Sequence, residues 1–288
     1  MSAAVVRHAV LRVGGSRASC ADEWLAVEEP LEIQVAGEPV ATTMRTPGED
    51  HFLALGFLFA EGIIAGADDV CGVYPAGPHT ASGFRSVVDV VPSSDARIDV
   101  ARLERSHRAV TPSSACGVCG RDSIADLCAR LVPRALRKGG LDGGLLARAP
   151  HILAEHQPSF QQTGGMHAAC AVNGRGEVLA HAEDVGRHNA VDKVVGRLLC
   201  RKPWPVEGQE LLLVVSGRAS FEVVQKAAVA GFGTVASVSA PSSLAVATAQ
   251  QAGLTLAGFV REGRFSLYTH PERIAMVRED ATGSPGER

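Results

Sequence analysis

The sequence predicts an α/β protein in which a mixed sheet covered by helices follows a smaller β-rich N-terminal region. From Gly165 onward, short apolar runs alternate with segments of helical periodicity, which is typical of sheet strands joined by helical crossovers. The N-terminal third of the chain has mostly strand and turn patterns with one helix. A length of 288 residues suffices for one large domain or two modest ones with a substantial core.

The composition shows no strong charge bias. Hydrophobic residues make up 46% of the chain and charged residues 20%, and the formal net charge is −3. A general nucleic-acid-binding protein would show a basic excess, so that class is disfavoured. No uncharged apolar run approaches the roughly 18 residues of a membrane-spanning helix, and the first residues lack the apolar core of a secretion signal. We therefore expect a cytoplasmic protein that binds neither nucleic acid nor membrane.

The seven cysteines are an odd number, which without a secretion signal favours reduced thiols over a disulfide framework. Only Cys116 and Cys119 are close in sequence, in the stretch SSACGVCGRD. The other five lie singly, and we expect each to be a small buried hydrophobic residue. They are Cys20, Cys71, Cys128, Cys170 and Cys200.

Residues 1–110 form the predicted β-rich region with one helix. The stretch LEIQVAGEPVATTMR predicts a hairpin that turns at residues 36–39, and an apolar helix is expected within 48–64, behind a proline and an acidic first turn. Residues 71–83 are rich in glycine and proline and are expected to form a loop. The β-branched run at 84–92 predicts a strand.

The rest of the chain divides into three predicted parts. Residues 111–145 hold the cysteine pair, a helix at 122–132 and a flexible turn at 138–144, residues 146–277 form the α/β core, and residues 278–288 are a frayed tail. The expected elements of the core, in chain order, are a hairpin within 166–184, a helix at 187–200, a strand at 210–217, a helix at 220–231, a strand at 234–240, a helix at 242–253 and a hairpin within 254–270.

Four loops of the predicted core follow strands and are rich in arginine or small hydroxyl residues. In α/β sheets the carboxyl ends of parallel strands meet at one edge, where helix N-termini attract anions. We therefore expect these loops to gather at one edge and to bind a ligand with phosphates, such as a nucleotide. The loops are EDVGRH at 183–188, SGRAS at 216–220, SAPSS at 239–243 and FVREGR at 259–264.

Arginines in three of these loops could supply charge-assisted hydrogen bonds to a phosphate. They are Arg187, Arg218, Arg261 and Arg264. Taken singly, each loop is also compatible with plain capping and turn chemistry. In that alternative Ser220 and either Ser242 or Ser243 are helix N-caps and Gly263 is a turn residue.

Common fingerprints of nucleotide enzymes and hydrolases are missing. The sequence has no GxxxxGK[ST] loop and no GxSxG nucleophile elbow. The stretch GFGTVA at 231–236 follows a helix and opens a strand, which is the wrong order for a dinucleotide-binding turn. The ordinary NTPase, dehydrogenase and hydrolase classes are thereby disfavoured.

Zinc binding is one chemistry open to the pair Cys116 and Cys119. Histidines would have to complete the site, because the sequence has no second CxxC. The stretch His181–Glu183 has the HxE form of zinc deaminases, but in those enzymes the cysteine motif follows HxE, whereas here it precedes it. A zinc-dependent deaminase-like enzyme therefore remains only as an alternative.

A thioredoxin-like dithiol and a sulfur carrier are the other two possibilities. The dithiol motif would follow directly on a strand, and no such pattern precedes Ser113. A sulfur carrier needs an accessible, mobile cysteine of low pKa. Gly117 and Gly120 permit movement, while Arg121 and the start of the next helix favour the thiolate. Sulfur carriage agrees best with these features, although a flexible loop with two inert thiols is also compatible.

Six motifs together resemble those of the FdhD/NarQ family, the formate dehydrogenase accessory sulfurtransferases. They are SSACGVCG, TGGMHAA, EDVGRHNAVDKVVG, SGRASFEVVQKAAVAG, SAPSSLAVATAQ and LAGFVREGRFSLYTHPERI. The resemblance runs from about Glu28 to Ile274, so the N-terminal end and the tail carry no inference from it. It implies a core similar to that of cytidine deaminases, with three layers and a mixed sheet but without their zinc.

The resemblance also implies a function. Proteins of this family accept persulfide sulfur from an IscS-type cysteine desulfurase and pass it to the molybdenum bis(molybdopterin guanine dinucleotide) cofactor before it enters the formate dehydrogenase apoenzyme. The cofactor would be bound cargo, no intrinsic metal is expected, and the family suggests a homodimer. A chaperone that holds the cofactor without sulfur transfer is the non-enzymatic alternative.

The family's site residues can be placed on this sequence. By the resemblance, Cys116 carries the persulfide with Cys119 as its helper, and the cofactor contacts lie at Phe259, Val260, Arg261, Glu262, Gly263 and Arg264. From the predicted topology we extend the cofactor contacts to Ser216, Gly217, Arg218, Ser239 and Ser242.

Overall fold

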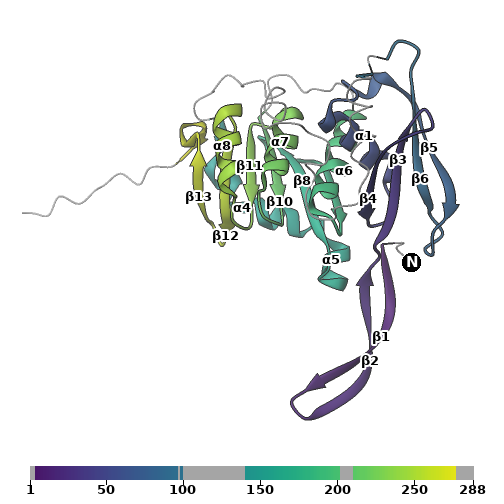
Figure 1. Ribbon diagram of the computed structural model, residues 1–288. Helices are drawn as coiled ribbons and strands as arrows, with labels where there is room; N and C mark the ends of the chain where they lie inside the picture. The colour runs from purple at the N-terminus through teal and green to yellow at the C-terminus, as the bar shows by residue number, and fades with distance from the viewer. Residues whose placement is uncertain (1–3, 97, 100–139, 202–209, 277–288) are drawn as a thin grey trace, which may run out of the picture.

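A computed structural model describes residues 4–96, 98–99, 140–201 and 210–276 of the chain. Within them the chain forms an extended two-stranded arm, a four-stranded unit with one main helix, and a six-stranded α/β core (Figure 1). This confirms the predicted α/β class with a β-rich N-terminal region. The domain boundaries expected after residues 110, 145 and 277 stay predictions.

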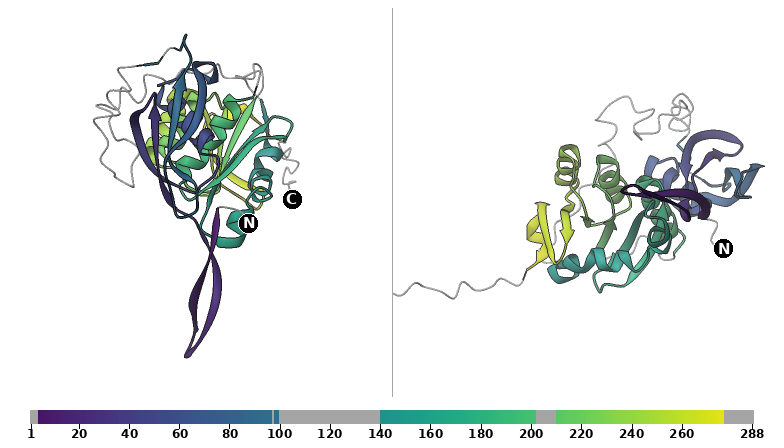
Figure 2. Two further views of the ribbon diagram at one scale, coloured as in Figure 1. Left: turned by 90° about the vertical axis from the view of Figure 1, so that its right-hand side faces the viewer. Right: turned by 90° about the horizontal axis from the view of Figure 1, so that it is seen from below.

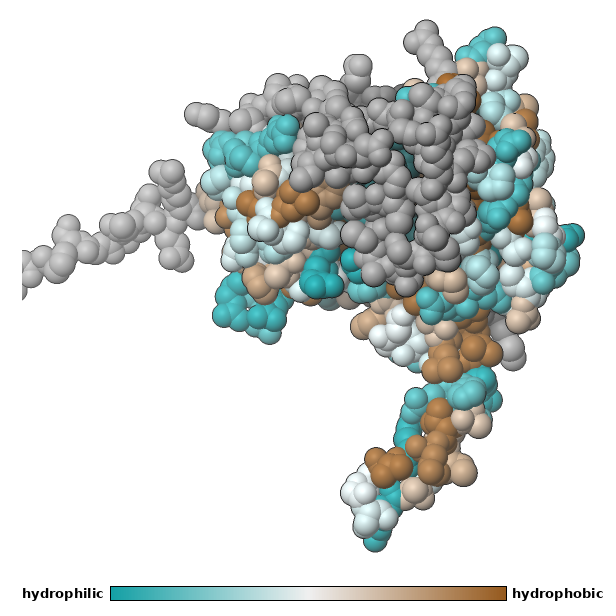
Figure 3. All heavy atoms as spheres, viewed as in Figure 1, coloured by the Kyte–Doolittle hydropathy of each residue, from teal (hydrophilic) through white to brown (hydrophobic). Residues whose placement is uncertain are grey.

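The arm is an antiparallel ribbon of β1 (Val5–Gly14) and β2 (Arg17–Ala26) that extends away from the rest of the protein (Figure 1). Ion pairs link Arg7 to Asp22 and Arg12 to Glu23 across the two strands. Its apolar side chains are largely exposed, and they show as brown spheres along the arm in Figure 3. The exposed apolar residues here are Val6, Leu11, Val13, Trp24 and Leu25.

The N-terminal unit packs one helix on a four-stranded sheet of order β4-β3-β6-β5. Leu31 and Ile33 of the sheet and Leu53 and Leu58 of the helix form its core. The predicted hairpin, helix and strand are all confirmed. The elements are β3 (Glu29–Val35), β4 (Glu38–Arg45), α1 (Asp50–Glu61), the short 3-10 helix η1 (Ala67–Asp69), β5 (Val70–His79) and β6 (Arg85–Pro92).

The loop predicted for residues 71–83 is wrong, because most of it is strand β5. Among the described residues this strand lies at the edge of its sheet and pairs with β6 alone. An edge strand tolerates proline, since half of its backbone N–H groups need no partner in the sheet. The glycines that suggested a loop, Gly72 and Gly77, lie where the pairing of β5 with β6 is irregular, so the strand continues past them.

The main sheet has six strands in the order β13-β12-β11-β10-β8-β9. The central strands β10, β11 and β12 run parallel, while β8 is antiparallel to both β10 and β9, and β13 is antiparallel to β12. The mixed sheet, its parallel crossovers and both predicted hairpins are thus confirmed. The strands are β8 (His167–Asn173), β9 (Val178–Asp184), β10 (Leu211–Val215), β11 (Thr234–Ser237), β12 (Thr255–Arg261) and β13 (Arg264–Thr269).

Helices cover both faces of the main sheet and give three layers (Figure 2). Along β10 the side chains alternate, so that Leu211, Leu213 and Val215 join one core while Leu212 and Val214 join the other. The first core lies under α6 (Arg187–Leu199), α7 (Phe221–Val229) and α8 (Ser243–Ala252), and the second lies under α4 (Gly143–Ala154).

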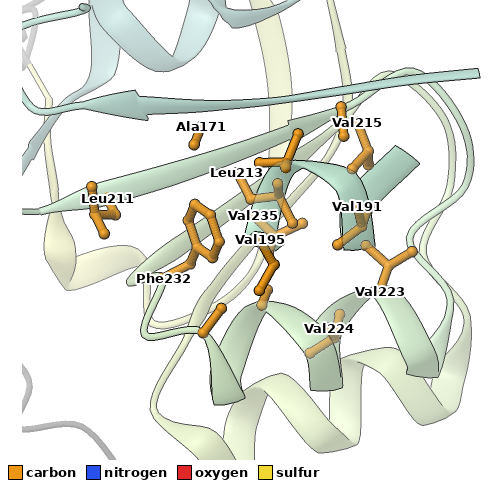
Figure 4. Packing of buried hydrophobic residues seen from close by; sticks show 14 of the residues in the cluster. Ala171, Val191, Val195, Leu211, Leu213, Val215, Val223, Val224, Phe232 and Val235 are labelled. Atoms are coloured by element: carbon orange, nitrogen blue, oxygen red, sulfur yellow. The ribbon is translucent and has the colours of Figure 1, made fainter. Parts of the chain in front are cut away.

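The larger core is filled by aliphatic side chains from the sheet and the helices. Figure 4 shows Leu213 and Val235 of the sheet beside Val195 of α6, with Phe232 next to them and Val224 of α7 below. All five side chains are fully buried. A core of this kind holds the strand ends in fixed positions, as a binding site at those ends requires.

The flexible turn predicted for residues 138–144 is wrong in its described part. Leu141 and Asp142 form the short strand β7, which pairs with β14 (Ile274–Ala275), and α4 begins at Gly143. The Asp142 carboxylate accepts a hydrogen bond of 2.9 Å from the Leu145 N–H and so caps α4. The described part of the chain also contains α5 (Pro158–Thr163) and the 3-10 helix η2 (Pro271–Arg273).

Among the helices that the structure describes, none is long and apolar enough to cross a lipid bilayer. The predicted helix at 122–132 and the predicted tail at 278–288 lie outside the described residues.

Candidate functional site

The four loops singled out in the sequence lie at one edge of the main sheet. Because β10, β11 and β12 are parallel, their carboxyl ends point the same way. Strand β9 shares this direction, since β8 lies antiparallel to both β9 and β10. The loops that follow β9, β10, β11 and β12 are therefore brought together, as the sequence predicted.

Hydrogen bonds tie these loops to one another and to β8. The Ser216 N–H donates to the Ala168 carbonyl at 3.0 Å, and the Ala168 N–H donates to the Ser216 hydroxyl at 2.9 Å. The Ser237 hydroxyl lies 2.7 Å from the Gly217 carbonyl oxygen and 3.0 Å from that of Ser239. Ser216 and Ser239 thus shape the backbone of the edge, and the Ser216 hydroxyl already has a partner.

The two predicted N-cap serines behave differently. The Ser242 hydroxyl accepts a hydrogen bond of 3.2 Å from the Ala245 N–H, so it caps α8. Ser220 occupies the N-cap of α7 but makes no capping bond with its side chain, because its hydroxyl lies 3.1 Å from Nε2 of His188. The predicted N-cap role is therefore confirmed for the Ser242 side chain. The Ser220 side chain does not cap α7, so the N-terminus of that helix has no side-chain cap.

The six residues of FVREGR at the β12–β13 turn differ in what they can contact. Phe259 is exposed, with a left-handed backbone (φ 52°), while the Val260 side chain is fully buried in the core under α4. Arg261 is exposed, and Arg264 forms an exposed ion pair of 2.6 Å with Glu262. Gly263 takes a positive φ of 73° in the turn. Phe259 and Arg261 are therefore the side chains best placed for a ligand.

His167 also belongs to this edge; it lies in the motif TGGMHAA but was not among the predicted site residues. It is the first residue of β8, and it pairs in register with Asp184 at the end of β9. A Cβ on Gly217 would lie 3.2 Å from Cε1 and Nδ1 of the His167 ring and 3.8 Å from Cδ of Arg187. The glycine thus lets an imidazole and an arginine stem approach the loop after β10.

Positive charge at this edge is incompletely balanced. Arg218 is exposed, and within the described chain neither Arg187 nor Arg218 forms an ion pair. The Nε atom of Arg187 is buried without a hydrogen-bond partner among the described residues. A buried donor without a partner is costly, and an anion is the kind of group that would satisfy it.

The nearest carboxylates are already engaged. Asp184 is fully buried and lies 2.6 Å from Nζ of Lys193, and it also accepts hydrogen bonds from the N–H groups of Thr46 and Gly186. Glu222 lies 2.7 Å from Nε2 of His188. Within the described chain Arg187, Arg218 and Arg261 are thus left without an ion pair at this edge.

The surroundings of His167 lower its pKa. Burial is the largest cause, followed by the positive charges of Arg187 and His188, and the charge of Arg218 adds to them, while Asp184 acts in the opposite direction. The His167 ring is therefore neutral at pH 7, and both Arg187 and Arg218 act on it electrostatically.

The cysteine pair Cys116 and Cys119 lies outside the described residues, as does Cys128. Of the other single cysteines, Cys170 is fully buried as predicted, and burial raises its pKa to about 12. The prediction of burial is wrong for the remaining three, which are exposed. They are Cys20, Cys71 and Cys200.

The HxE stretch of β9 is occupied by local contacts. The His181 ring stacks on that of His156 with centroids 4.5 Å apart. The Glu183 carboxylate accepts hydrogen bonds from the Ser159 and Phe160 N–H groups, at 2.9 and 2.7 Å, at the start of α5. Within the described ranges no three His, Cys, Asp or Glu side chains are grouped to hold a metal ion.

Comparison with known proteins identifies the family. Residues 26–275 match the model of the FdhD/NarQ family. The chain belongs to this family. It is 51% identical to the sulfur carrier protein FdhD of Anaeromyxobacter dehalogenans over 95% of each chain. It is also 42% identical to the protein of the same name from Streptomyces avermitilis, over 96% of this chain and 98% of the relative.

A solved structure shares the fold. The crystal structure of a Desulfotalea psychrophila protein, provisionally named a formate dehydrogenase accessory protein, superposes with a TM-score of 0.71 and 24% sequence identity. The match covers 94% of this chain and 99% of the other. The family match begins at residue 26, so it leaves out nearly all of the β1–β2 arm.

Proposed function

We propose that this chain is a sulfurtransferase of formate dehydrogenase maturation. It takes persulfide sulfur from an IscS-type cysteine desulfurase and delivers it to the molybdenum bis(molybdopterin guanine dinucleotide) cofactor, which it binds as cargo. Membership of the FdhD/NarQ family and the name of its relatives, sulfur carrier protein FdhD, support the carrier role. The structural observation that carries the proposal concerns Arg187 and Arg218, neither of which forms an ion pair within the described chain. Both lie at the edge of the main sheet where β9, β10, β11 and β12 end, which we call the strand-end edge.

The strand-end edge suits a dinucleotide cargo. Each guanine dinucleotide contains a pyrophosphate, and guanidinium groups bind phosphate oxygens with paired hydrogen bonds. Arg187, Arg218 and Arg261 are available for this contact. The exposed ring of Phe259 offers a flat apolar surface on which guanine can stack. The Ser216, Gly217 and Ser239 backbone and the capping residue Ser242 would position these groups.

The two loop cysteines divide the sulfur chemistry between them. The Cys116 thiolate attacks the terminal sulfur of the desulfurase persulfide, so a new S–S bond forms on Cys116 and the desulfurase thiolate leaves. The Cys119 thiolate then attacks Sγ of Cys116, forming a Cys116–Cys119 disulfide, and the terminal sulfur leaves as sulfide. The released hydrosulfide would replace an oxo ligand of the cargo's molybdenum, and with one proton from solvent that oxygen would leave as water. A cellular dithiol reduces the disulfide and restores both thiols.

The reaction sequence sets the partners and the place of action. A desulfurase supplies the sulfur, and a formate dehydrogenase apoenzyme receives the finished cofactor. Both exchanges require free thiols, which persist in the reducing cytoplasm. We propose a cytoplasmic homodimer, and light scattering in solution would measure the mass of the assembly.

Mass spectrometry of the cysteine loop tests the carrier role. After incubation with an IscS-type desulfurase and cysteine, the peptide containing Cys116 should gain the mass of one sulfur atom. Cys116→Ala should abolish the gain, whereas Cys119→Ala should retain it because only release depends on Cys119. Because Cys119 can release the sulfur in the wild type, an unmodified Cys116 in Cys119→Ala is the result that contradicts the proposal. Active formate dehydrogenase made with Cys116→Ala would favour the cofactor-holding chaperone, and stoichiometric zinc in the purified protein would favour the deaminase-like alternative.

A further inference from the structure

Three groups that carry or can carry positive charge surround the backbone of Gly217. The His167 ring and the Arg187 stem both lie within van der Waals distance of the Cβ position that Gly217 lacks. Arg218 follows Gly217 directly, and its charge acts on the His167 imidazole. The three side chains come from β8, α6 and the loop after β10, so the sheet topology, rather than sequence proximity, brings them together.

No ion pair within the described chain neutralises Arg187 or Arg218, although the Glu222 carboxylate acts electrostatically on Arg187. Asp184, the carboxylate nearest to His167 in register, pairs with Lys193, and Glu222 pairs with His188. The helices that start here, α6 and α7, have no side-chain cap at their N-termini, so unpaired N–H groups add partial positive charge. The buried, unpartnered Nε of Arg187 is an independent sign that a group with acceptor atoms completes the site.

We propose that His167, Arg187, Arg218 and the Gly217 backbone form the site that binds the pyrophosphate of the cargo, an inference that rests on the proposed function. We further propose that His167 takes up a proton when the pyrophosphate binds. The imidazole then acts as a third cation toward the phosphate oxygens. His167 lies in the motif TGGMHAA but was not among the predicted cofactor contacts, and it makes the affinity for the cargo depend on pH.

The sign of this dependence follows from the charges around the ring. In the free protein, burial and the electrostatic effects of Arg187, His188 and Arg218 lower the pKa of His167, and Asp184, paired with Lys193, only partly offsets them. A bound pyrophosphate brings negative charge next to the ring and raises its pKa. Because the complex then holds one more proton than the free protein, affinity increases as pH falls, by at most about tenfold per pH unit.

The probe for this test is the dinucleoside pyrophosphate guanosine(5′)diphospho(5′)guanosine. Its two phosphates are diesters and carry a constant charge near neutrality, so any pH dependence of binding between pH 6 and pH 8 comes from the protein. Calorimetry of the full chain would be run at several pH values, each in two buffers of different ionisation enthalpy. The difference between buffers gives the number of protons taken up per bound probe.

Two variants isolate the histidine. His167→Gln keeps polarity and approximate size but cannot titrate in this range, whereas His151→Gln removes an exposed histidine on α4 as a matched control. Thermal denaturation of each variant shows whether it is folded. We expect binding about three- to tenfold tighter at pH 6 than at pH 8 in the wild type and in His151→Gln. In His167→Gln we expect weaker, pH-independent binding without proton uptake.

The outcomes separate this inference from the proposed function. Binding that is independent of pH in the wild type, or a pH dependence that persists in His167→Gln, overturns the role of His167 and leaves the dinucleotide-binding function standing. Absence of binding at every pH overturns both. If His167→Gln does not fold, an NMR titration of the wild-type His167 ring gives the answer: its pKa must rise when the probe is added, and an unchanged pKa overturns the inference.

Discussion

Gly56 of α1 lies directly against the backbone of Asp192 in α6, so close that a Cβ at residue 56 would overlap the Asp192 carbonyl group. The contact is reciprocal, because a Cβ on Gly196 of α6 would overlap the carbonyl group of Phe52 in α1. The two helices thus cross with their backbones touching, and the crossing joins the N-terminal unit to the α/β core. Close helix contact of this kind depends on the absence of side chains at both glycines.

We expect Gly56→Ala to destabilise the fold by about 1–3 kcal/mol or more, because the helices must move apart to admit the methyl group. Denaturant unfolding followed by circular dichroism would measure the loss. Gly66→Ala is the matched control, since the Cβ of residue 66 would enter open space on an extended backbone. Equal stability of the two variants would contradict the close helix contact.

The buried ion pair of Asp192 and Lys226 gives a second prediction. Lys226 Nζ lies 2.7 and 2.9 Å from the two carboxylate oxygens, and both side chains are almost completely buried. Lys226→Met leaves the carboxylate without its cation and should cost about 3–5 kcal/mol at pH 8. Asp192→Leu combined with Lys226→Met should recover most of this loss, because no charge remains buried. A double variant as unstable as the single one would contradict this account.

The same pair predicts how stability changes with pH. Burial raises the pKa of Asp192 to about 6, above the value of about 3.9 expected for an unfolded chain. The folded state therefore binds more protons between these values, and the contribution of Asp192 to stability is lost as pH rises through 6. Removing the cation raises the pKa of the carboxyl further, so Lys226→Met should gain stability between pH 8 and pH 5. Unfolding curves at both values would measure it, and a variant equally unstable at both would contradict the prediction.

The sequence predicted the core better than the periphery, for reasons visible in particular elements. Strands such as β10 are buried on both faces, so their continuous apolar runs identify them. Strand β5 has one free edge, which accepts the prolines and glycines that suggested a loop. Helix α4 was not predicted at all; its first turn holds adjacent glycines at 143 and 144, which are poor helix formers, and tertiary packing on the sheet outweighs their local preference.

The sequence also predicted the four loops of the strand-end edge, but not the contribution from the start of β8. Loops at carboxyl ends of parallel strands could be placed from strand and helix order alone. His167 was not assigned to the edge, because β8 is antiparallel to β10 and contributes its amino end, whereas only loops after strands were considered. Two signals could have found it: His167 lies within the motif TGGMHAA, and the predicted hairpin within 166–184 puts the start of its first strand beside the end of its second.

Thiol exposure gives a prediction that also sets the background for the persulfide experiment. Cys170 is fully buried in β8 and its pKa is raised by burial to about 12, so it should resist alkylation by iodoacetamide in the native protein. Cys20 and Cys71 are exposed and should be modified. Peptide mapping after a short treatment would show the difference. Rapid modification of Cys170 under native conditions would contradict the packing of β8.

The arginines of the strand-end edge should differ in their contribution to cargo binding. Arg187 has a buried guanidinium nitrogen without a partner in the described chain, whereas Arg264 is exposed and already paired with Glu262. Charge-assisted hydrogen bonds contribute about 1.5–3 kcal/mol each. Arg187→Gln should therefore weaken binding of guanosine(5′)diphospho(5′)guanosine by about tenfold or more, and Arg264→Gln by less than about threefold.

Calorimetry at two salt concentrations would test this order of effects. The Arg187 contribution comes from a partly buried group and should persist when salt is raised, while that of exposed Arg264 should be screened. Thermal stability should not fall in Arg187→Gln, because the substitution also removes the unsatisfied buried Nε. If Arg264→Gln weakened binding more than Arg187→Gln, the pyrophosphate would lie at the β12–β13 turn and not beside Gly217.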